Sequence, residues 1–248
     1  MISSKALVLI TGANQGIGFA VARQLARSNK YHVLVSSRTA SKAEAAVQEL
    51  QTDAVHKMAL TPITLDVTDD ASVAAAAKMV SDQFGHLDIL INNAGLGGVP
   101  AAAVREQYQQ IFEVNVFSVA VVTEAFLPLM RASSYPDRRI VNVSSGVGLI
   151  TMAGEEGYEF NAKAWYVPEY RSSKAALNMI TAAQSVKFAD DNIAVIAAAP
   201  GMCRTRFTGG QGMKDASDGA KAIVRAATEG DPKELTGTFV ADEPHSGW

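Results

Sequence analysis

Short apolar runs alternate with longer amphipathic stretches along most of the chain. The runs are nearly continuous and rich in Val, Ile and Ala, which is typical of strands buried on both faces. They cover residues 6–11, 32–36, 63–66, 89–92, 139–144, 193–199 and 238–240. Apolar residues recur at helical spacing between them, which predicts helices at 17–28, 42–50, 72–84, 106–130 and 173–189. This alternation predicts an α/β fold, a doubly wound parallel sheet of about seven strands with helices on both faces.

The chain shows no sign of division into separate domains. Its 248 residues contain no linker, no low-complexity segment and no internal repeat, so we expect one domain over 1–248. Two irregular segments, 146–168 and 201–217, interrupt the alternation of strands and helices. Long irregular segments inside a compact domain are usually lids, binding loops or mobile regions.

Composition excludes several classes of partner. The net charge of −3, the pI near 5.8 and the lack of a Lys/Arg run argue against nucleic acid as a partner. The apolar runs are shorter than the ~18 residues of a membrane-spanning helix, so we expect no membrane segment. A cationic leader is also not found before the first run.

Cysteine and histidine usage indicates a reducing compartment and no metal. Cys203 is the only cysteine, so no intrachain disulfide can form, and we expect a cytoplasmic protein. The histidines are scattered without the spacing of metal ligands. They are His32, His56, His86 and His245.

A glycine-rich loop directly follows the first apolar run and leads into the first predicted helix. Glycine lets the backbone turn sharply and approach a ligand without a Cβ clash, and a helix N-terminus offers free amides to a pyrophosphate. A turn without any ligand is the alternative interpretation. We expect a dinucleotide to contact Gly12, Asn14, Gln15, Gly16, Ile17 and Gly18.

The end of the second apolar run indicates which dinucleotide the loop binds. An NAD site places a carboxylate there to accept hydrogen bonds from the ribose 2′-hydroxyl, whereas this chain reads Ser36-Ser37-Arg38-Thr39. The guanidinium of Arg38, with Ser37 beside it, can pair with a 2′-phosphate, so we predict NADP(H). The alternative is that Arg38 is a solvated charge at the end of a strand.

Asp66 and Val67 follow the third apolar run. The carboxylate of Asp66 and the backbone amide of Val67 could read the edge of an adenine ring. Equally, Asp66 could only cap the turn before the next helix.

Tyr170 and Lys174 are four positions apart near the start of a predicted helix. Residues at i and i+4 share a helix face, so the ammonium of Lys174 can lie near the phenol of Tyr170. A positive charge favours the ionised phenol, so we expect a lowered pKa of Tyr170 and a proton donor that works near neutral pH. The same spacing arises by chance on helix surfaces, so this interpretation depends on the rest of the chain.

Four further polar motifs follow the predicted elements in order. They are Asn92-Asn93-Ala94-Gly95, Asn115, Ser145 and Pro200-Gly201. Together with the glycine loop and the Tyr/Lys pair, they make nearly the whole chain resemble the short-chain dehydrogenase/reductase family. The resemblance implies a single-domain Rossmann fold and a nicotinamide cofactor. Further cofactor contacts would come from Asn93, Ala94, Gly95, Tyr170, Lys174, Pro200, Gly201, Met202 and Thr205.

The resemblance also implies catalytic roles. Ser145 would hydrogen-bond a substrate carbonyl oxygen, Tyr170 would protonate it, and Lys174 would hold the nicotinamide ribose and tune Tyr170. Asn115 would anchor a proton-relay water, although an Asn within a helix can instead make a local backbone bond. Ser144 is the neighbouring candidate; since only one of two successive strand side chains points inward, Ser145 is chosen by its position in the family pattern.

The stretch between Ser145 and Tyr170 is longer than the family pattern requires. We call residues 147–168 the insertion, and expect it beside the substrate site. It carries Glu155, Glu156, Tyr158, Phe160, Trp165 and Tyr166. The insertion resembles the one found in the carbonyl-reductase group. Members of that group also tend to end with a Thr-Gly-x-Phe strand and a terminal Trp, which correspond here to residues 236–239 and Trp248.

Three expectations follow from the irregular segments. The aromatic residues of the insertion would line a pocket for a bulky or aromatic ketone or aldehyde, or would only pack the insertion onto its own domain. The insertion would also leave a monomer or dimer in place of a tetramer. Met202, Cys203 and Met213 would form a flap over the site, or would only fill gaps.

The sequence therefore favours an NADPH-dependent carbonyl reductase that interconverts ketones or aldehydes with alcohols. A 3-ketoacyl-thioester reductase of the same fold is one alternative. A non-catalytic NADP-sensing protein is another, but it would not need an acid catalyst.

Overall fold

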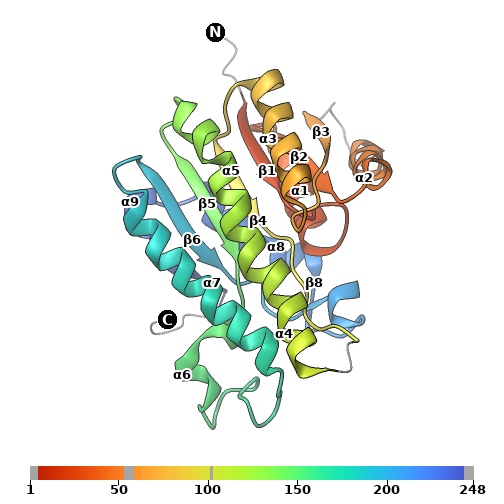
Figure 1. Cartoon of the computed structure of the whole chain (residues 1–248), viewed down its shortest axis with the longest axis vertical. Helices are drawn as coiled ribbons and strands as arrows, with labels where there is room; N and C mark the ends of the chain where they lie inside the picture. The colour runs from red at the N-terminus through yellow and green to blue at the C-terminus, as the bar shows by residue number, and fades with distance from the viewer. Residues whose placement is uncertain (1–4, 53–58, 101–102, 243–248) are drawn as a thin grey trace.

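A parallel sheet forms the centre of the molecule in the computed structural model, which describes residues 5–52, 59–100 and 103–242. Its strand order is β3-β2-β1-β4-β5-β6-β9 (Figure 1). The strands are β1 (Ala6–Ile10), β2 (Tyr31–Ser37), β3 (Leu60–Thr64), β4 (Ile89–Asn92), β5 (Arg138–Val143), β6 (Ile193–Ala198) and β9 (Phe239–Val240). The predicted doubly wound sheet of about seven strands is confirmed. Trp248 lies outside the described residues.

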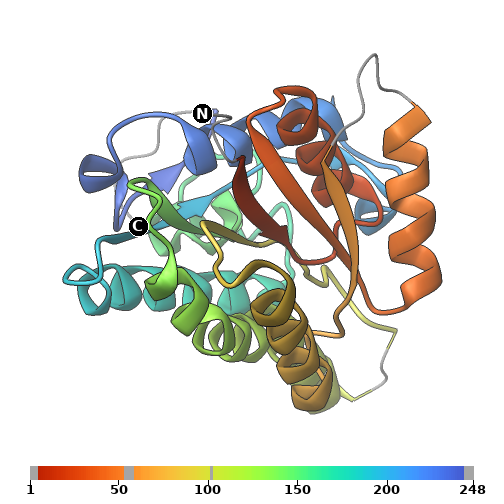
Figure 2. The same cartoon turned by 90° about the horizontal axis from the view of Figure 1, so that it is seen from above.

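Helices cover both faces of this sheet (Figure 2). On one face α1 (Gly16–Arg27) packs against α8 (Ala216–Thr228). The other face carries α3 (Asp70–Phe84), α5 (Ser118–Ala132) and α7 (Pro168–Lys187). α2 (Ala40–Thr52) lies against the edge formed by β2 and β3. The two faces therefore enclose two separate apolar cores.

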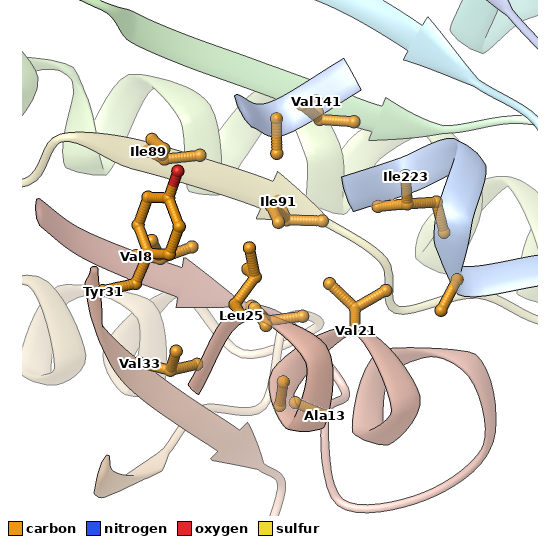
Figure 3. Packing of buried hydrophobic residues seen from close by; sticks show 14 of the residues in the cluster. Val8, Ala13, Val21, Leu25, Tyr31, Val33, Ile89, Ile91, Val141 and Ile223 are labelled. Atoms are coloured by element: carbon orange, nitrogen blue, oxygen red, sulfur yellow. The ribbon is translucent and has the colours of Figure 1, made fainter. Parts of the chain in front are cut away.

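Alternation of side chains along each strand supplies both cores at once. Val8 belongs to the core under α1 and α8, whereas Leu9, the next residue, belongs to the core under α3 and α5. Figure 3 shows the first of these cores, where strand side chains such as Val8 and Ile91 meet Val21 of α1 and Ile223 of α8. Burial of one such side chain stabilises the fold by roughly 1.5–3 kcal/mol. Because both faces are buried, the strands need apolar residues at nearly every position.

The long helix expected at 106–130 is divided into three parts. α4 (Val104–Phe112), a π-helical segment (Glu113–Phe117) and α5 follow one another without a gap. Asn115 lies in the π-helical segment and is fully buried. Val104–Ala132 is long and apolar enough in composition to cross a membrane, but half of its most apolar window is buried within the fold. The packing of α5 on the sheet accounts for the buried part of this stretch, whereas Val104 and Phe117 are exposed.

α7 begins earlier than the predicted residue 173. Pro168 stands at the start of this helix, where its missing N–H would have had no helical partner in any case. Tyr170 therefore lies in the first turn of α7, at the end of the helix that faces the carboxyl edge of the sheet.

The topology places a binding crevice at the carboxyl ends of β1 and β4. The chain leaves β1 toward β2 on one side, and β4 lies on the other side of β1. Ligands of open α/β sheets bind at such a point of reversal. The irregular segments of the chain reach the same edge: one contains α6 (Ile150–Ala153), at the lower end in Figure 1, and the other contains the strand pair β7 (Cys203–Arg204) and β8 (Lys214–Asp215).

Candidate active site

A cleft of about 890 Å³ runs along the carboxyl edge of the sheet. All of the cofactor-binding residues predicted from the sequence line it, and so do three of the four predicted catalytic residues. The lining includes Gly12, Asn14, Gln15, Gly16, Ile17, Gly18, Ser37, Arg38, Asp66, Val67, Asn93, Ala94, Gly95, Ser145, Tyr170, Lys174, Pro200, Gly201, Met202 and Thr205. Asn115 is the exception, because it is buried beneath the cleft.

The glycine loop is shaped to let a ligand approach the backbone. Gly12 and Gly16 have φ values of 62° and 60°, a left-handed conformation that favours glycine. A Cβ on Gly18 would lie 2.4 Å from Nδ2 of Asn93 and 2.8 Å from the carbonyl oxygen of Gly12. The side chain of Gln15 does not cap α1, and the first residues of this helix line the cleft. The loop therefore fits the pyrophosphate of a dinucleotide.

Asn93 holds this loop in place from the end of β4. Its Nδ2 donates to the carbonyl oxygens of Thr11 at 2.8 Å and Gly12 at 3.2 Å. The amides of Asn93 and Ala94 both donate to the Thr11 hydroxyl at 2.9 Å. Asn93 thus supports the glycine loop from below, a contact that the sequence motif alone did not specify.

Two positively charged side chains line the cleft near the carboxyl end of β2. Arg38 and Lys42 are both exposed there and line the cleft. Lys42 was not predicted, because an exposed lysine near a helix start looks like any solvated charge. Both side chains are of the kind that pairs with phosphate groups, and the predicted contact of Arg38 with a 2′-phosphate stays a prediction.

The carboxylate of Asp66 takes part in a turn. Its Oδ1 accepts hydrogen bonds from the amide of Thr68 at 3.1 Å and from its hydroxyl at 2.8 Å. The N-cap of α3 is Asp69 and not Asp66. Asp66 and Val67 still line the cleft, so the expected contact with an adenine edge stays a prediction.

Ser145, Tyr170 and Lys174 meet deep in the cleft. The Ser145 hydroxyl hydrogen-bonds to the Tyr170 phenol, and Nζ of Lys174 lies 5.8 Å from the centre of the Tyr170 ring. Tyr170 and Lys174 are 7% and 5% exposed. The sequence motifs therefore converge at one place, where two hydroxyl groups and an ammonium surround a small space.

The expected direction of the Tyr170 shift is wrong. Burial raises the pKa of Tyr170 to about 12, and the hydrogen bond from Ser145 opposes this only in part. Burial also lowers the pKa of Lys174 to about 8. Desolvation disfavours the charged form of each group, and here it outweighs the attraction that the spacing suggested. The phenol accordingly keeps its proton throughout the neutral range.

Ser144 lines the same cleft but binds a different partner. Its hydroxyl donates to Oδ1 of Asn178 at 2.5 Å, on the inner side of α7. The Ser144 hydroxyl is therefore engaged by α7, whereas Ser145, the next residue, acts on Tyr170.

Both the oxygen and the nitrogen of the Asn115 side chain form hydrogen bonds with other residues. Oδ1 accepts from the amide of Leu96 at 2.8 Å, while Nδ2 donates to the Leu96 carbonyl at 2.8 Å and to the Ser173 hydroxyl at 3.0 Å. Asn115 therefore joins the π-helical segment to the loop after β4 and to α7. The anchoring of a relay water by this residue stays a prediction.

Aromatic rings line the far end of the cleft. We call Tyr158, Phe160 and Trp165 of the insertion the aromatic wall; neighbouring rings in it are 5.9 Å apart between centroids. The wall continues to Tyr170, whose ring centroid is 6.4 Å from that of Trp165. Tyr166 points to solvent, with 77% exposure, and does not belong to the wall.

Phe207 closes the row from the opposite side. Its ring centroid lies 5.9 Å from that of Tyr170, and it packs directly over Gly97, where an added Cβ would lie 2.7 Å from the ring. Sequence reasoning missed Phe207, although the single aromatic residue of the irregular segment 201–217 was a usable signal.

The predicted flap of Met202, Cys203 and Met213 is partly wrong. Met202 and Met213 line the cleft and are joined by a backbone hydrogen bond of 2.9 Å. Cys203 is 1% exposed and packs on Gly219, where a Cβ would lie 2.2 Å from its sulfur. Although Cys203 also belongs to the lining of the cleft, its side chain fills a gap against α8, as the alternative interpretation expected.

Comparison with known proteins places the chain in a family. A model of the short chain dehydrogenases matches residues 6–215. The chain belongs to the short-chain dehydrogenase family, whose members are oxidoreductases that use nicotinamide cofactors. It is 56% identical over 242 residues to the short-chain dehydrogenase anuI of Penicillium roqueforti, a match that covers 97% of this chain and 95% of that protein.

Solved structures show the same fold over nearly the whole chain. The NADPH-bound carbonyl reductase from chicken fatty liver is 26% identical, with a TM-score of 0.80 and 96% of both chains covered. Salutaridine reductase from Papaver somniferum is also 26% identical, with a TM-score of 0.79, and the match covers 95% of this chain and 99% of that one.

Proposed function

We propose that this oxidoreductase is an NADPH-dependent reductase of ketones or aldehydes, which oxidises secondary alcohols in reverse. The observation that carries the proposal is the hydrogen-bonded pair of Ser145 and Tyr170 beside Lys174, inside a cleft that also holds the glycine loop. The names of two structural neighbours, a carbonyl reductase and salutaridine reductase, support reduction of a carbonyl group as the reaction.

The chemistry follows from the two hydroxyl groups. The nicotinamide cofactor supplies the hydride when it is bound. Ser145 and Tyr170 then donate hydrogen bonds to the carbonyl oxygen, on which negative charge develops, so they stabilise the transition state more than the ground state. With a pKa of about 12, Tyr170 is protonated at neutral pH and is the proton donor. Lys174 stands one helical turn away, where its ammonium favours the same negative charge.

The preference for NADPH depends on the cleft at the end of β2. Arg38 and Lys42 offer two positive charges to a 2′-phosphate, and residues 36–39 contain no carboxylate that would repel it. The carbonyl reductase neighbour is an NADPH-bound structure, which supports the same preference.

The aromatic wall supports a bulky or aromatic substrate. Flat rings provide a large contact area and lose little conformational entropy on binding. Trp165 of the wall packs against the Tyr170 ring, so a substrate whose carbonyl reaches Ser145 and Tyr170 would lie against Trp165.

Turnover measurements test the proposal. Oxidation of NADPH and NADH would be followed with a panel of aromatic, aliphatic and ketoacyl-thioester carbonyl compounds, with Tyr170→Phe as the control. We expect turnover of aromatic ketones or aldehydes with NADPH as the better cofactor. Turnover of thioesters alone would favour the ketoacyl-reductase alternative, and tight NADPH binding without any turnover would favour a sensor.

A further inference from the structure

A buried arginine follows Tyr170 directly. Arg171 is 8% exposed and lies in the first turn of α7. Its guanidinium reaches backbone carbonyl oxygens at the beginning of the insertion and in its second half. The contacts place it between the helix that carries Tyr170 and the loop that carries the aromatic wall.

Three carbonyl groups accept hydrogen bonds from this one side chain. Nη1 donates to Val147 at 3.2 Å, Nε and Nη2 each donate to Trp165 at 3.2 Å, and Nη2 also donates to Phe160. Val147 stands at the beginning of the insertion, and Phe160 and Trp165 stand in its second half. The guanidinium therefore connects parts of the insertion that are distant in sequence.

Only arginine can make this set of contacts. A guanidinium presents five N–H donors in a planar fork, whereas the ammonium of lysine presents its donors from a single point. The insertion contains little regular secondary structure beyond α6, so its buried carbonyl groups need other partners. Arg171 supplies to the insertion the donors that a helix or sheet would otherwise provide.

Two of the three acceptors belong to residues of the aromatic wall. The carbonyl groups of Phe160 and Trp165 are held by Arg171, and their rings line the cleft. Trp165 in turn packs against the Tyr170 ring. The position of the wall relative to the proton donor is thus fixed through the residue next to that donor.

We propose that Arg171 is a positioning residue that determines substrate specificity, because its fork holds the aromatic wall at a set distance from Tyr170. The effect of Arg171 on substrate specificity rests on the proposed function, whereas its positioning of the aromatic wall does not. Loss of the fork frees the insertion and removes the preformed surface for a bulky ketone. A small ketone contacts the wall less, so its reduction depends on Arg171 less.

Amide hydrogen exchange tests the positioning without any turnover. In Arg171→Met, which retains an apolar stem but has no donors, we expect exchange within 150–166 to be roughly 10-fold faster or more, since hydrogen bonds from charged donors are lost. Peptides from β1, β4 and β5 should exchange as in the wild type. The matched control is Lys163→Met, which removes an exposed cation from the same insertion and should change nothing.

Kinetics test the specificity. For Arg171→Met the ratio of kcat/KM between a bulky aromatic ketone and a small aliphatic ketone should fall roughly 10-fold, mainly through KM for the bulky ketone. If Arg171→Met does not fold, Arg171→Lys carries the same comparison, because one ammonium cannot reach three carbonyl groups.

Unchanged exchange in 150–166, or exchange that rises equally in the sheet, would overturn the proposal. An equal loss of activity toward both ketones would overturn it too. Absence of ketone turnover in the wild type would count against the proposed function alone, since the exchange result still decides the positioning.

Discussion

Lys174 donates a hydrogen bond of 2.8 Å from Nζ to the backbone carbonyl oxygen of Val143. Val143 ends β5, the strand that leads to Ser145, and Lys174 lies one turn after Tyr170 in α7. The bond therefore joins the strand that precedes the serine to the helix that carries the tyrosine. It also explains how a lysine with 5% exposure is accommodated, because a buried ammonium needs hydrogen-bond acceptors.

Stability should rise with pH through the titration of Lys174. Burial lowers its pKa from 10.5 to about 8, so below about pH 8 both folded and unfolded chains hold the proton and the folded state bears the full penalty. Above about pH 8 the folded chain releases the proton while the unfolded chain retains it, and the penalty declines as pH rises toward 10.5. The shift corresponds to about 3 kcal/mol in total. Denaturant unfolding of wild type and Lys174→Met at a series of pH values measures this effect.

At high pH the titration of three tyrosines also changes the stability of both proteins. The raised pKa values of Tyr31, Tyr135 and Tyr170 make the folded chain retain protons that the unfolded chain releases above its ordinary value of 10.0, so stability declines again there. Between about pH 8 and pH 10 the wild type should gain stability relative to Lys174→Met. A parallel pH dependence of the two proteins would contradict the assignment.

Removal of the Tyr170 hydroxyl should abolish proton donation and leave the cofactor site intact. In Tyr170→Phe we expect kcat to fall by ~10² to 10⁴, the range typical of general acid catalysis. The dissociation constant for NADPH, measured by calorimetry, should stay near that of the wild type, because the glycine loop and Arg38 are unchanged. A variant that retains most of its kcat would show that another group delivers the proton.

Ser145 and Ser144 offer a matched pair of substitutions. Ser145→Ala should lower kcat strongly, by ~10² or more, because one of two donors to the developing negative charge is lost, while stability changes little. Ser144→Ala leaves Oδ1 of Asn178 without its 2.5 Å donor and should lower the free energy of unfolding by about 1–3 kcal/mol, with much less effect on kcat. Steady-state kinetics and urea unfolding of both variants test this assignment. A large loss of kcat in Ser144→Ala with little loss in Ser145→Ala would make Ser144 the catalytic serine.

Arg38 should set the preference between the two dinucleotides. Arg38→Ala removes a charged donor to the 2′-phosphate, so KM for NADPH should rise roughly 10- to 100-fold. KM for NADH should not rise, because that dinucleotide has no such phosphate. Lys42→Ala should act in the same direction and more weakly, since an ammonium does not form a bidentate pair. Equal changes for NADPH and NADH would place the phosphate elsewhere.

Most of the fold could be read from local pattern. The strands could be predicted because each contributes side chains to two cores and is therefore apolar at nearly every position. The glycine loop could be predicted because it follows β1 directly and leads into a helix N-terminus. The π-helical segment around Asn115 left no such mark, because its sequence has ordinary helical spacing. Pro168 at the start of α7 was a usable sign, although the helix was expected to begin later.

Long-range packing limited the prediction of the site. Spacing alone placed Lys174 near Tyr170, but the sign of the pKa change depends on burial by segments far away in sequence. Cys203 was indistinguishable from a flap residue until its contact with Gly219 was known. Arg171 was passed over because its acceptors are backbone carbonyl groups, which carry no sequence signal.

The glycine at position 97 has a consequence for how substrate preference can change over evolution. Phe207 occupies the space that any side chain there would need, and the same ring borders Tyr170. A larger residue at 97 would have to displace this phenyl group, and with it the ring that borders Tyr170. Substitution at this one position would therefore change the lining of the cleft beside the proposed proton donor.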